Sequence, residues 1–301
     1  MTTAILTRPT LGQRVAGPLA ALVGFLRLLA RRPVGLAGFI GIVFFLLLAF
    51  VVPFFVPLTN DPNVGAIYQP PSLAHPLSTD FQGKDVLNQI VYGGRDILLV
   101  AILAAFFSTV IAITLGSLAA IVGGRLDAAL VAITDVALTV PQLILLIAVA
   151  AILRPTSLFF VAVILGLLQW SNLLLQIRAQ VLSLKERDYV EAARSLDLGL
   201  FHIIFREILP TMRSYIVINF VLAVSQAMYA QVGIILLGLV PLSGTNWGIM
   251  LYFARDQGAL FFRDSLWYIL SPIVAISLVQ LSLVYFASAL EEIFNPRLGG
   301  A

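Results

Sequence analysis

Residues that could perform catalysis or hold a ligand are few in this chain and lie far apart. Among its 301 residues there is no cysteine, which excludes disulfides, thiol nucleophiles and cysteine metal sites. The two histidines, His75 and His202, are separated by long apolar runs, and no H-E-x-x-H zinc motif or nucleophile elbow occurs. Gly83-Lys84-Asp85 lacks the glycine spacing and the hydroxyl of a phosphate-binding loop. We therefore expect no catalytic site, no metal site and no cofactor bound by this chain.

The longest polar stretch in the second half, Tyr189–Pro210, reads YVEAARSLDLGLFHIIFREILP. Its first part is rich in strong helix formers. We expect Asp188 to cap this helix, with Glu191 completing a capping box three residues later. Ala192 and Ala193 would then give the helix a small apolar face surrounded by charges.

A turn and a second helix follow in this stretch. Asp197 and Gly199 interrupt the helical pattern, and both residue types tolerate a positive φ better than most. Leu200–Leu209 is helical in character and stops at Pro210, which cannot continue a helix. The pattern alone fits either a connecting loop between membrane helices or a docking element for another protein.

Polar residues within the apolar runs are the remaining candidates for function. Acidic or amide side chains inside a membrane usually face a protein interior or a water-filled path. The candidates of this kind for a solute path are Asp135, Asn219, Gln226, Tyr229 and Gln231, and Trp247, in the loop expected before the last span, is a further candidate. The same residues could instead hold helices together, and Trp247 could be an anchor at the membrane interface.

The composition is that of an integral membrane protein. Hydrophobic residues make up 60% of the chain and charged residues only 11%, whereas soluble proteins carry roughly 25% charged residues. The mean hydropathy is +1.02. We expect an all-α fold with six transmembrane helices, each near the ~20 apolar residues that a bilayer requires. The expected spans are Val34–Pro57, Ile97–Val122, Ala128–Ile152, Ser157–Ile177, Ser214–Val240 and Leu266–Leu290.

The placement of basic residues predicts the orientation in the membrane. Lys and Arg accumulate in cytoplasmic segments. With the N-terminus inside, thirteen of the 18 basic residues fall on the inner side, and the five on the outer side are Lys84, Arg95, Arg154, Arg255 and Arg263. Both termini are therefore expected in the cytoplasm, and so is the Tyr189–Pro210 stretch.

The sequence EAARSL from Glu191 to Leu196, followed by a turn and Ile208-Leu209-Pro210, resembles the EAA loop of permease subunits of ATP-binding-cassette importers. In that family the loop couples the permease to a separate ATPase subunit. The resemblance implies coupling roles for Asp188, Tyr189, Glu191, Ala192, Ala193, Asp197 and Gly199. One departure concerns Asp197, because the family usually has glycine at this position.

Further motifs resemble the C-type permease of the oligopeptide and dipeptide importers, in that family's order along nearly the whole chain. They are Asp61-Pro62-Asn63, His75–Arg95, Gly124-Arg125-Leu126-Asp127, Asp135 with Pro141, PLSGTNWGIML from Pro241, and the tail Glu291–Leu298, where Asn295 replaces the usual Asp.

The resemblance implies a type I importer permease fold in the cell membrane. It divides the chain into a cytoplasmic segment (1–33), a first transmembrane helix with an external loop (34–96), a permease core (97–290) that contains the coupling hairpin (188–210), and a cytoplasmic tail (291–301). The implied partners are a homologous second permease, two ATPase subunits that carry ATP and Mg, an extracytoplasmic solute-binding protein and the lipid bilayer. No nucleic acid is implied.

The solute is less clearly indicated than the class. In peptide-transporting members the position of Gln231 is usually Glu, and the variant segment that follows here resembles members associated with oligosaccharides. An uncharged path with amides and aromatics also suits a neutral polyhydroxyl solute. Oligosaccharides and oligopeptides both remain candidates. The alternative class is a self-sufficient secondary transporter, although such proteins often show inverted repeats and broken helices.

Overall fold

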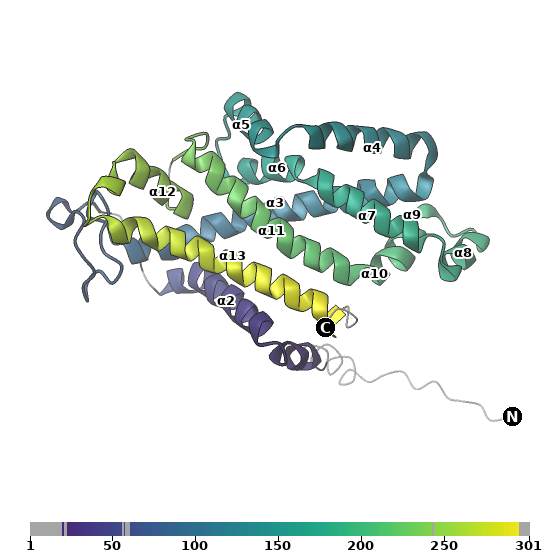
Figure 1. Cartoon of the computed structure of the whole chain (residues 1–301), viewed down its shortest axis with the longest axis horizontal. Helices are drawn as coiled ribbons and strands as arrows, with labels where there is room; N and C mark the ends of the chain where they lie inside the picture. The colour runs from purple at the N-terminus through teal and green to yellow at the C-terminus, as the bar shows by residue number, and fades with distance from the viewer. Residues whose placement is uncertain (1–19, 21–22, 56, 58–60, 243, 295–301) are drawn as a thin grey trace.

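A computed structural model describes residues 20, 23–55, 57, 61–242 and 244–294 of the chain. The expected features of the first 19 residues and of the tail from Asn295 to Ala301 lie outside this range. The described residues form helices joined by turns and short loops (Figure 1). The elements are α2 (Pro33–Phe50), η1 (Val52–Phe54), η2 (Val64–Ala66), α3 (Val86–Val122), α4 (Gly124–Thr139), α5 (Gln142–Leu153), α6 (Leu158–Leu168), α7 (Trp170–Leu184), α8 (Asp188–Ser195), α9 (Leu200–His202), η3 (Ile203–Ile208), α10 (Leu209–Thr211), α11 (Arg213–Leu236), α12 (Trp247–Asp256), η4 (Ala259–Phe261) and α13 (Leu266–Phe294).

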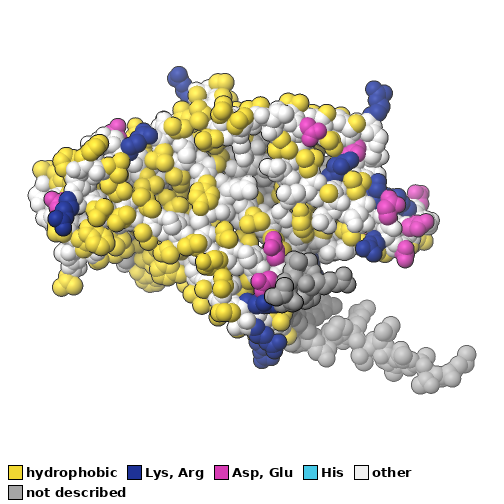
Figure 2. Space-filling model, in the orientation of Figure 1, with side chains coloured by type: hydrophobic (Ala, Val, Ile, Leu, Met, Phe, Trp, Pro, Cys, Tyr) yellow, Lys and Arg dark blue, Asp and Glu magenta, His cyan; other side chains and the backbone are white. Residues whose placement is uncertain are grey.

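Four described helical segments are long and apolar enough to cross a membrane: Pro33–Phe54, Val86–Val122, Arg213–Leu236 and Leu266–Phe294. Two bent helix pairs, α4 with α5 and α6 with α7, raise this number to six if each pair is one span. Figure 2 shows apolar side chains over much of the middle of the molecule, while charged side chains gather mainly toward its ends. The expected all-α, polytopic architecture is confirmed.

The bundle is built around α3, which contacts α2, α6, α7 and α11. This helix begins at Val86, eleven residues before the expected span, because the side chain of Asp85 accepts a hydrogen bond from the Asn88 amide at 2.7 Å and caps it. The polar residues of the first three turns concealed this extension from a hydropathy pattern. At the other end Gly123 terminates the helix with φ 67°.

The third and fourth expected spans are bent rather than straight. Between α4 and α5 the chain turns by 89° at Val140 and Pro141. Proline disfavours the helical conformation in the residue before it, and Val140 is accordingly extended, with φ −86° and ψ 125°. The α6–α7 pair bends by 47° at Gln169. Helix α11 also ends at Leu236, earlier than the expected Val240.

Helices α2 and α13 pack closely side by side (Figure 1). A Cβ atom added at Gly38 would lie 2.7 Å from the backbone nitrogen of Phe286, so only glycine allows this approach. Such small-residue contacts are typical of membrane helices, where the hydrophobic effect does not drive helix association.

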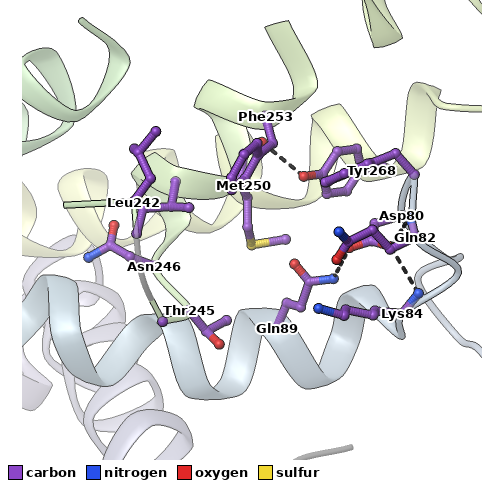
Figure 3. Close-up of a pocket in the computed structure, with 13 residues that line it drawn as sticks. Asp80, Gln82, Lys84, Gln89, Leu242, Thr245, Asn246, Met250, Phe253 and Tyr268 are labelled. Atoms are coloured by element: carbon purple, nitrogen blue, oxygen red, sulfur yellow. Dashed lines mark hydrogen bonds between the residues drawn. The ribbon is translucent and has the colours of Figure 1, made fainter. Parts of the chain in front are cut away.

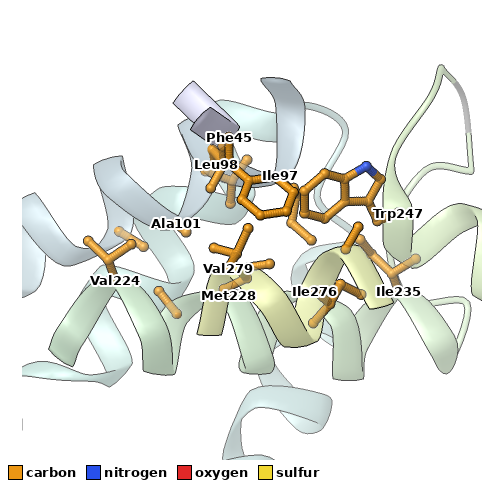
Figure 4. Packing of buried hydrophobic residues seen from close by; sticks show 14 of the residues in the cluster. Phe45, Ile97, Leu98, Ala101, Val224, Met228, Ile235, Trp247, Ile276 and Val279 are labelled. Atoms are coloured by element: carbon orange, nitrogen blue, oxygen red, sulfur yellow. The ribbon is translucent and has the colours of Figure 1, made fainter. Parts of the chain in front are cut away.

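The main core lies where α2, α3, α11, α12 and α13 meet, and Trp247 is its largest side chain (Figure 4). Its ring is fully buried and meets Phe45 edge-on at 5.9 Å between centroids. A Cβ at Gly94 would lie 2.9 Å from this ring. The indole Nε1 donates a hydrogen bond to the carbonyl of Ile90 at 2.8 Å. Trp247 therefore ties α12 to α3.

Candidate functional site

The Tyr189–Pro210 stretch forms a helical hairpin at one end of the molecule (Figure 1). We call this the hairpin end, and the opposite end, which carries residues 61–85, the loop end. Helix α8 is as expected, but its N-cap is Arg187 and no side chain caps it. The expected capping box of Asp188 and Glu191 is therefore wrong. Both acids instead lie in the first turn, where negative charge favours the helix dipole.

A Schellman motif ends α8. The amide of Leu198 donates to the carbonyl of Ala193, and the amide of Asp197 donates to that of Arg194. Asp197 occupies the left-handed position with φ 53°, where glycine is usual. Gly199, in contrast, has φ −58° and ψ 161°, which other residues can adopt. The turn thus depends on Asp197 and not on Gly199.

The second arm of the hairpin continues as helix through its whole length. α9 leads into a π-helical turn over Ile203–Ile208 and then into α10, which contains Pro210. The expected stop at Pro210 is wrong, because proline is tolerated in the first turn of the short α10. The arm joins α11 after Met212.

One face of the hairpin is buried in a second core. Val190 is fully buried and Ala193 is only 4% exposed. Both belong to a cluster with buried residues of α3, α7 and the second hairpin arm. The hairpin therefore packs against α3 and α7. The expectation that Ala193 lies on the exposed apolar face of α8 is wrong, because its methyl group is buried in this core.

The opposite face of the hairpin is exposed and partly aromatic. Leu196 is 72% exposed and Phe201 74% exposed. Phe201 and Phe205 stack with 4.4 Å between their ring centroids. Asp188, Glu191 and Ala192 are also exposed, and Tyr189 partly so. The two phenylalanines were not among the predicted coupling residues, although their i, i+4 spacing in a charged segment was a signal in the sequence.

The candidate path residues do not share one surface. Gln226 and Tyr229 lie on an exposed side of α11, and Asp135 is exposed on α4. Asn219 is half-buried, and its amide donates to the Tyr215 carbonyl at 2.9 Å.

Gln231 and Trp247 are buried, at 1% and 0% exposure. The full burial of Trp247 argues against a path-lining role and against an anchor at the membrane interface. Its bulk and its hydrogen bond serve the core. Gln231 lies inside the protein near the loop end, five residues before α11 ends at Leu236.

A polar cavity of about 260 Å³ opens at the loop end, between α12, the start of α3 and residues 80–84 (Figure 3). Asp80 is its buried acid. The carboxylate of Asp80 accepts hydrogen bonds from the amides of Gln82 and Lys84 and from Nε2 of Gln89, all at 2.7–2.9 Å. Burial, with a smaller effect from the charge of Asp80, raises the pKa of the neighbouring Tyr68. These contacts fix the loop, because they tie the carboxylate to two backbone amides of the loop and to a side chain of α3.

Comparison with known proteins gives the family. The profile of the binding-protein-dependent transport system inner membrane component matches residues 112–300. The chain belongs to this family. It is 34% identical to a protein of Brucella suis named as a peptide permease, over 87% of both chains. It is 28% identical to the dipeptide transport system permease protein of Bacillus subtilis, over 90% of this chain and 84% of that protein. A third relative, the oligopeptide transport system permease protein of Bacillus subtilis, is 27% identical over 87% and 85%.

The chain is thus an importer permease of the peptide transport family, as its motifs predict. As a multi-pass membrane protein of this family, the permease works with ATPase and binding-protein partners. Among the described residues, no group of three or more His, Asp or Glu side chains is arranged to hold a metal ion. The hairpin and the polar residues of α4 and α11 are therefore the candidate elements for coupling and for the solute path.

Proposed function

We propose that this permease forms half of the translocation path of an ATP-driven importer for oligosaccharides or oligopeptides, and that its hairpin (188–210) receives the motion of the ATPases. A homologous second permease supplies the other half of the path. Two ATPase subunits bind ATP and Mg, and an extracytoplasmic binding protein delivers the solute. This chain is non-catalytic.

The two-sided hairpin is the observation that carries the proposal. Its exposed face offers Phe201, Phe205 and Leu196 beside the acids of α8, which suits a groove with apolar walls and a basic rim. Its buried face is packed with α3 and α7. Since packed cores shift as rigid units, a push on the exposed face is passed to the long helices.

The solute path is proposed along the exposed side of α11. Gln226 and Tyr229 would be costly against lipid, because the amide of Gln226 and the hydroxyl of Tyr229 would find no hydrogen-bond partner there. A second permease placed against this side would enclose them. The names of the relatives favour peptides, whereas the amides and aromatics of this side suit neutral solutes. Family membership gives no support to a self-sufficient secondary transporter.

Charge reversal and added bulk on the exposed face test the coupling. Glu191→Lys places a positive charge in the first turn of α8, whereas Glu186→Lys lies before the helix and is the matched control. Ala192→Trp adds bulk on the exposed side. Ala193→Trp is not a clean probe, because it would overpack the hairpin's own core.

The measurement is solute-stimulated ATP hydrolysis and transport by the assembled transporter, with the amount in the membrane as control. We expect Glu191→Lys and Ala192→Trp to reduce both rates at least tenfold and Glu186→Lys to retain them. Losing a buried charge contact costs ~3–5 kcal/mol, against ~0–1 kcal/mol for an exposed pair. Unchanged transport by both test variants would make the hairpin a simple connector.

A further inference from the structure

A second cavity lies near the loop end, between the start of α6, the last turns of α11 and the start of α12. Its volume is about 180 Å³. Thr156, Ser157 and Leu158 are exposed at its mouth, while Gln231 and Asn246 lie buried at its base. No Asp, Glu, Lys or Arg lines it among the described residues.

Three of the four polar atoms of these two amides have no partner in the described part of the chain. Gln231 is 1% exposed, and neither its Oε1 nor its Nε2 makes a hydrogen bond there. Asn246 is also 1% exposed. Its Oδ1 accepts from the Gly248 amide at 2.8 Å and caps α12, but its Nδ2 is likewise unpaired.

Another buried glutamine, Gln280, has a hydrogen-bond partner for both its oxygen and its nitrogen. Gln280 on α13 accepts a hydrogen bond from the hydroxyl of Ser225 and donates from Nε2 to the Ser225 carbonyl. Leaving a buried amide unpaired is costly, so unpaired groups in native proteins call for an explanation. Three unpaired amide atoms that share one cavity indicate that a group outside the chain pairs them.

The size and chemistry of the cavity limit that partner. A single water needs only ~10–15 Å³ of such space, so this cavity holds far more than one. Because no charged side chain lines it, a neutral group fits best. Gln231 both donates and accepts, and Asn246 adds a donor. The occupant must therefore accept and donate hydrogen bonds at once, as a sugar hydroxyl or a peptide amide does.

We propose that this cavity is a solute-contact site at the external entrance of the path, where Gln231 and Asn246 bind a hydroxyl or amide group of the transported solute. The inference rests on the proposed permease function and extends it to named contacts. Asn246 holds the group while also capping α12, so solute binding and the position of α12 are linked.

Cysteine protection tests this proposal, since the chain has no cysteine and any introduced one is unique. Thr156→Cys places a thiol at the mouth. The assembled transporter, in vesicles with its binding protein, is labelled with N-ethylmaleimide, alone or with maltotriose or trialanine. Phe261→Cys, whose native side chain is 89% exposed in η4, is the control thiol. We expect one solute to slow labelling of Thr156→Cys at least fivefold and that of Phe261→Cys not at all.

The second arm adds Gln231→Leu or Asn246→Ser to Thr156→Cys. Serine retains an oxygen that caps α12, but it lacks the amide nitrogen and its shorter side chain withdraws from the cavity. We expect either change to abolish the protection. Slowing by maltotriose identifies hydroxyl recognition, and slowing by trialanine identifies amide recognition. The proposal is overturned if neither solute slows labelling, which would mean a cavity filled by water only, or if protection survives Gln231→Leu. Glu191→Lys distinguishes this failure from that of the proposed function, because it tests coupling and not the cavity.

Discussion

At the scale of single residues, two buried glutamines of this bundle should respond oppositely to the same substitution. Gln280→Leu leaves the Ser225 hydroxyl without its partner, which costs ~1–3 kcal/mol. Gln231→Leu removes an amide that has no partner among the described residues, and it adds apolar surface of similar volume. We expect thermal unfolding of the purified permease to shift to lower temperature for Gln280→Leu and to stay equal or rise for Gln231→Leu. Equal destabilisation by both would show that Gln231 has a structural partner.

The sequence identified candidate path residues by their chemical type, but it could not predict which of them are buried. Gln226, Tyr229 and Gln231 stood out because they interrupt an apolar run, and Trp247 stood out through its motif. In a bundle where nearly every helix face is apolar, periodicity cannot tell a core face from an exposed one. Only the packing of α12 against α3 shows that Trp247 belongs to the core.

At the scale of elements, the turn of the hairpin gives a matched pair of substitutions. Asp197 has a positive φ, so Asp197→Val should destabilise the turn by about 1–2 kcal/mol, whereas Asp197→Gly should be tolerated. Gly199 has negative φ and open space around its Cα, so Gly199→Ala should have little effect. Thermal unfolding and transport measure these differences. A loss with Gly199→Ala as large as that with Asp197→Val would contradict this account.

Helix α4 offers a second prediction at this scale. It contacts α3 and α7 and begins at Gly124, which has a positive φ, as does Gly123 before it. Its tie to α7 is a bidentate pair, in which Arg178 donates to both carboxylate oxygens of Asp127 at 2.5 and 2.6 Å. Asp127→Asn should therefore loosen α4, because it removes the charge while retaining the shape.

Hydrogen exchange of residues 124–139 measures this loosening. We expect several-fold faster exchange in Asp127→Asn, with no change in α11. Arg125→Gln is the control, since Arg125 is exposed and makes no described ion pair. Unchanged exchange in Asp127→Asn would show that apolar contacts alone hold α4.

The existence of most helices followed from the sequence, while their bends and ends did not. Hydropathy located all the long apolar segments, because a bilayer requires them. The start of α3 was missed because Asn88, Gln89 and Arg95 lower the hydropathy, although the cap at Asp85 had a sequence signal. Pro141 signalled a break, but the 89° angle depends on how α5 packs on α6 and α11.

At the scale of the whole molecule, the chain has the properties of one half of an assembly. Helices α4 and α5 expose large apolar side chains such as Val136, Ile144 and Ile152, which are at least 60% exposed. The polar side of α11 is exposed as well. Lipid can contact the apolar side chains of α4 and α5, but it offers no hydrogen-bond partner to the amide of Gln226. We therefore expect a protein partner to bind the polar side of α11.

The orientation in the membrane is the last prediction. The hairpin end carries Arg187, Arg194 and Arg206, and thirteen of the 18 basic residues fall on this predicted side. Because Lys and Arg remain in the cytoplasm, this end should face inward, where ATPases can reach the hairpin. A fluorescent reporter fused after Ala301 should be active in the cytoplasm. An epitope tag inserted near the exposed Pro70 should react with antibody on intact spheroplasts. A C-terminus found outside would reject the six-span arrangement and remove the hairpin from the reach of any ATPase.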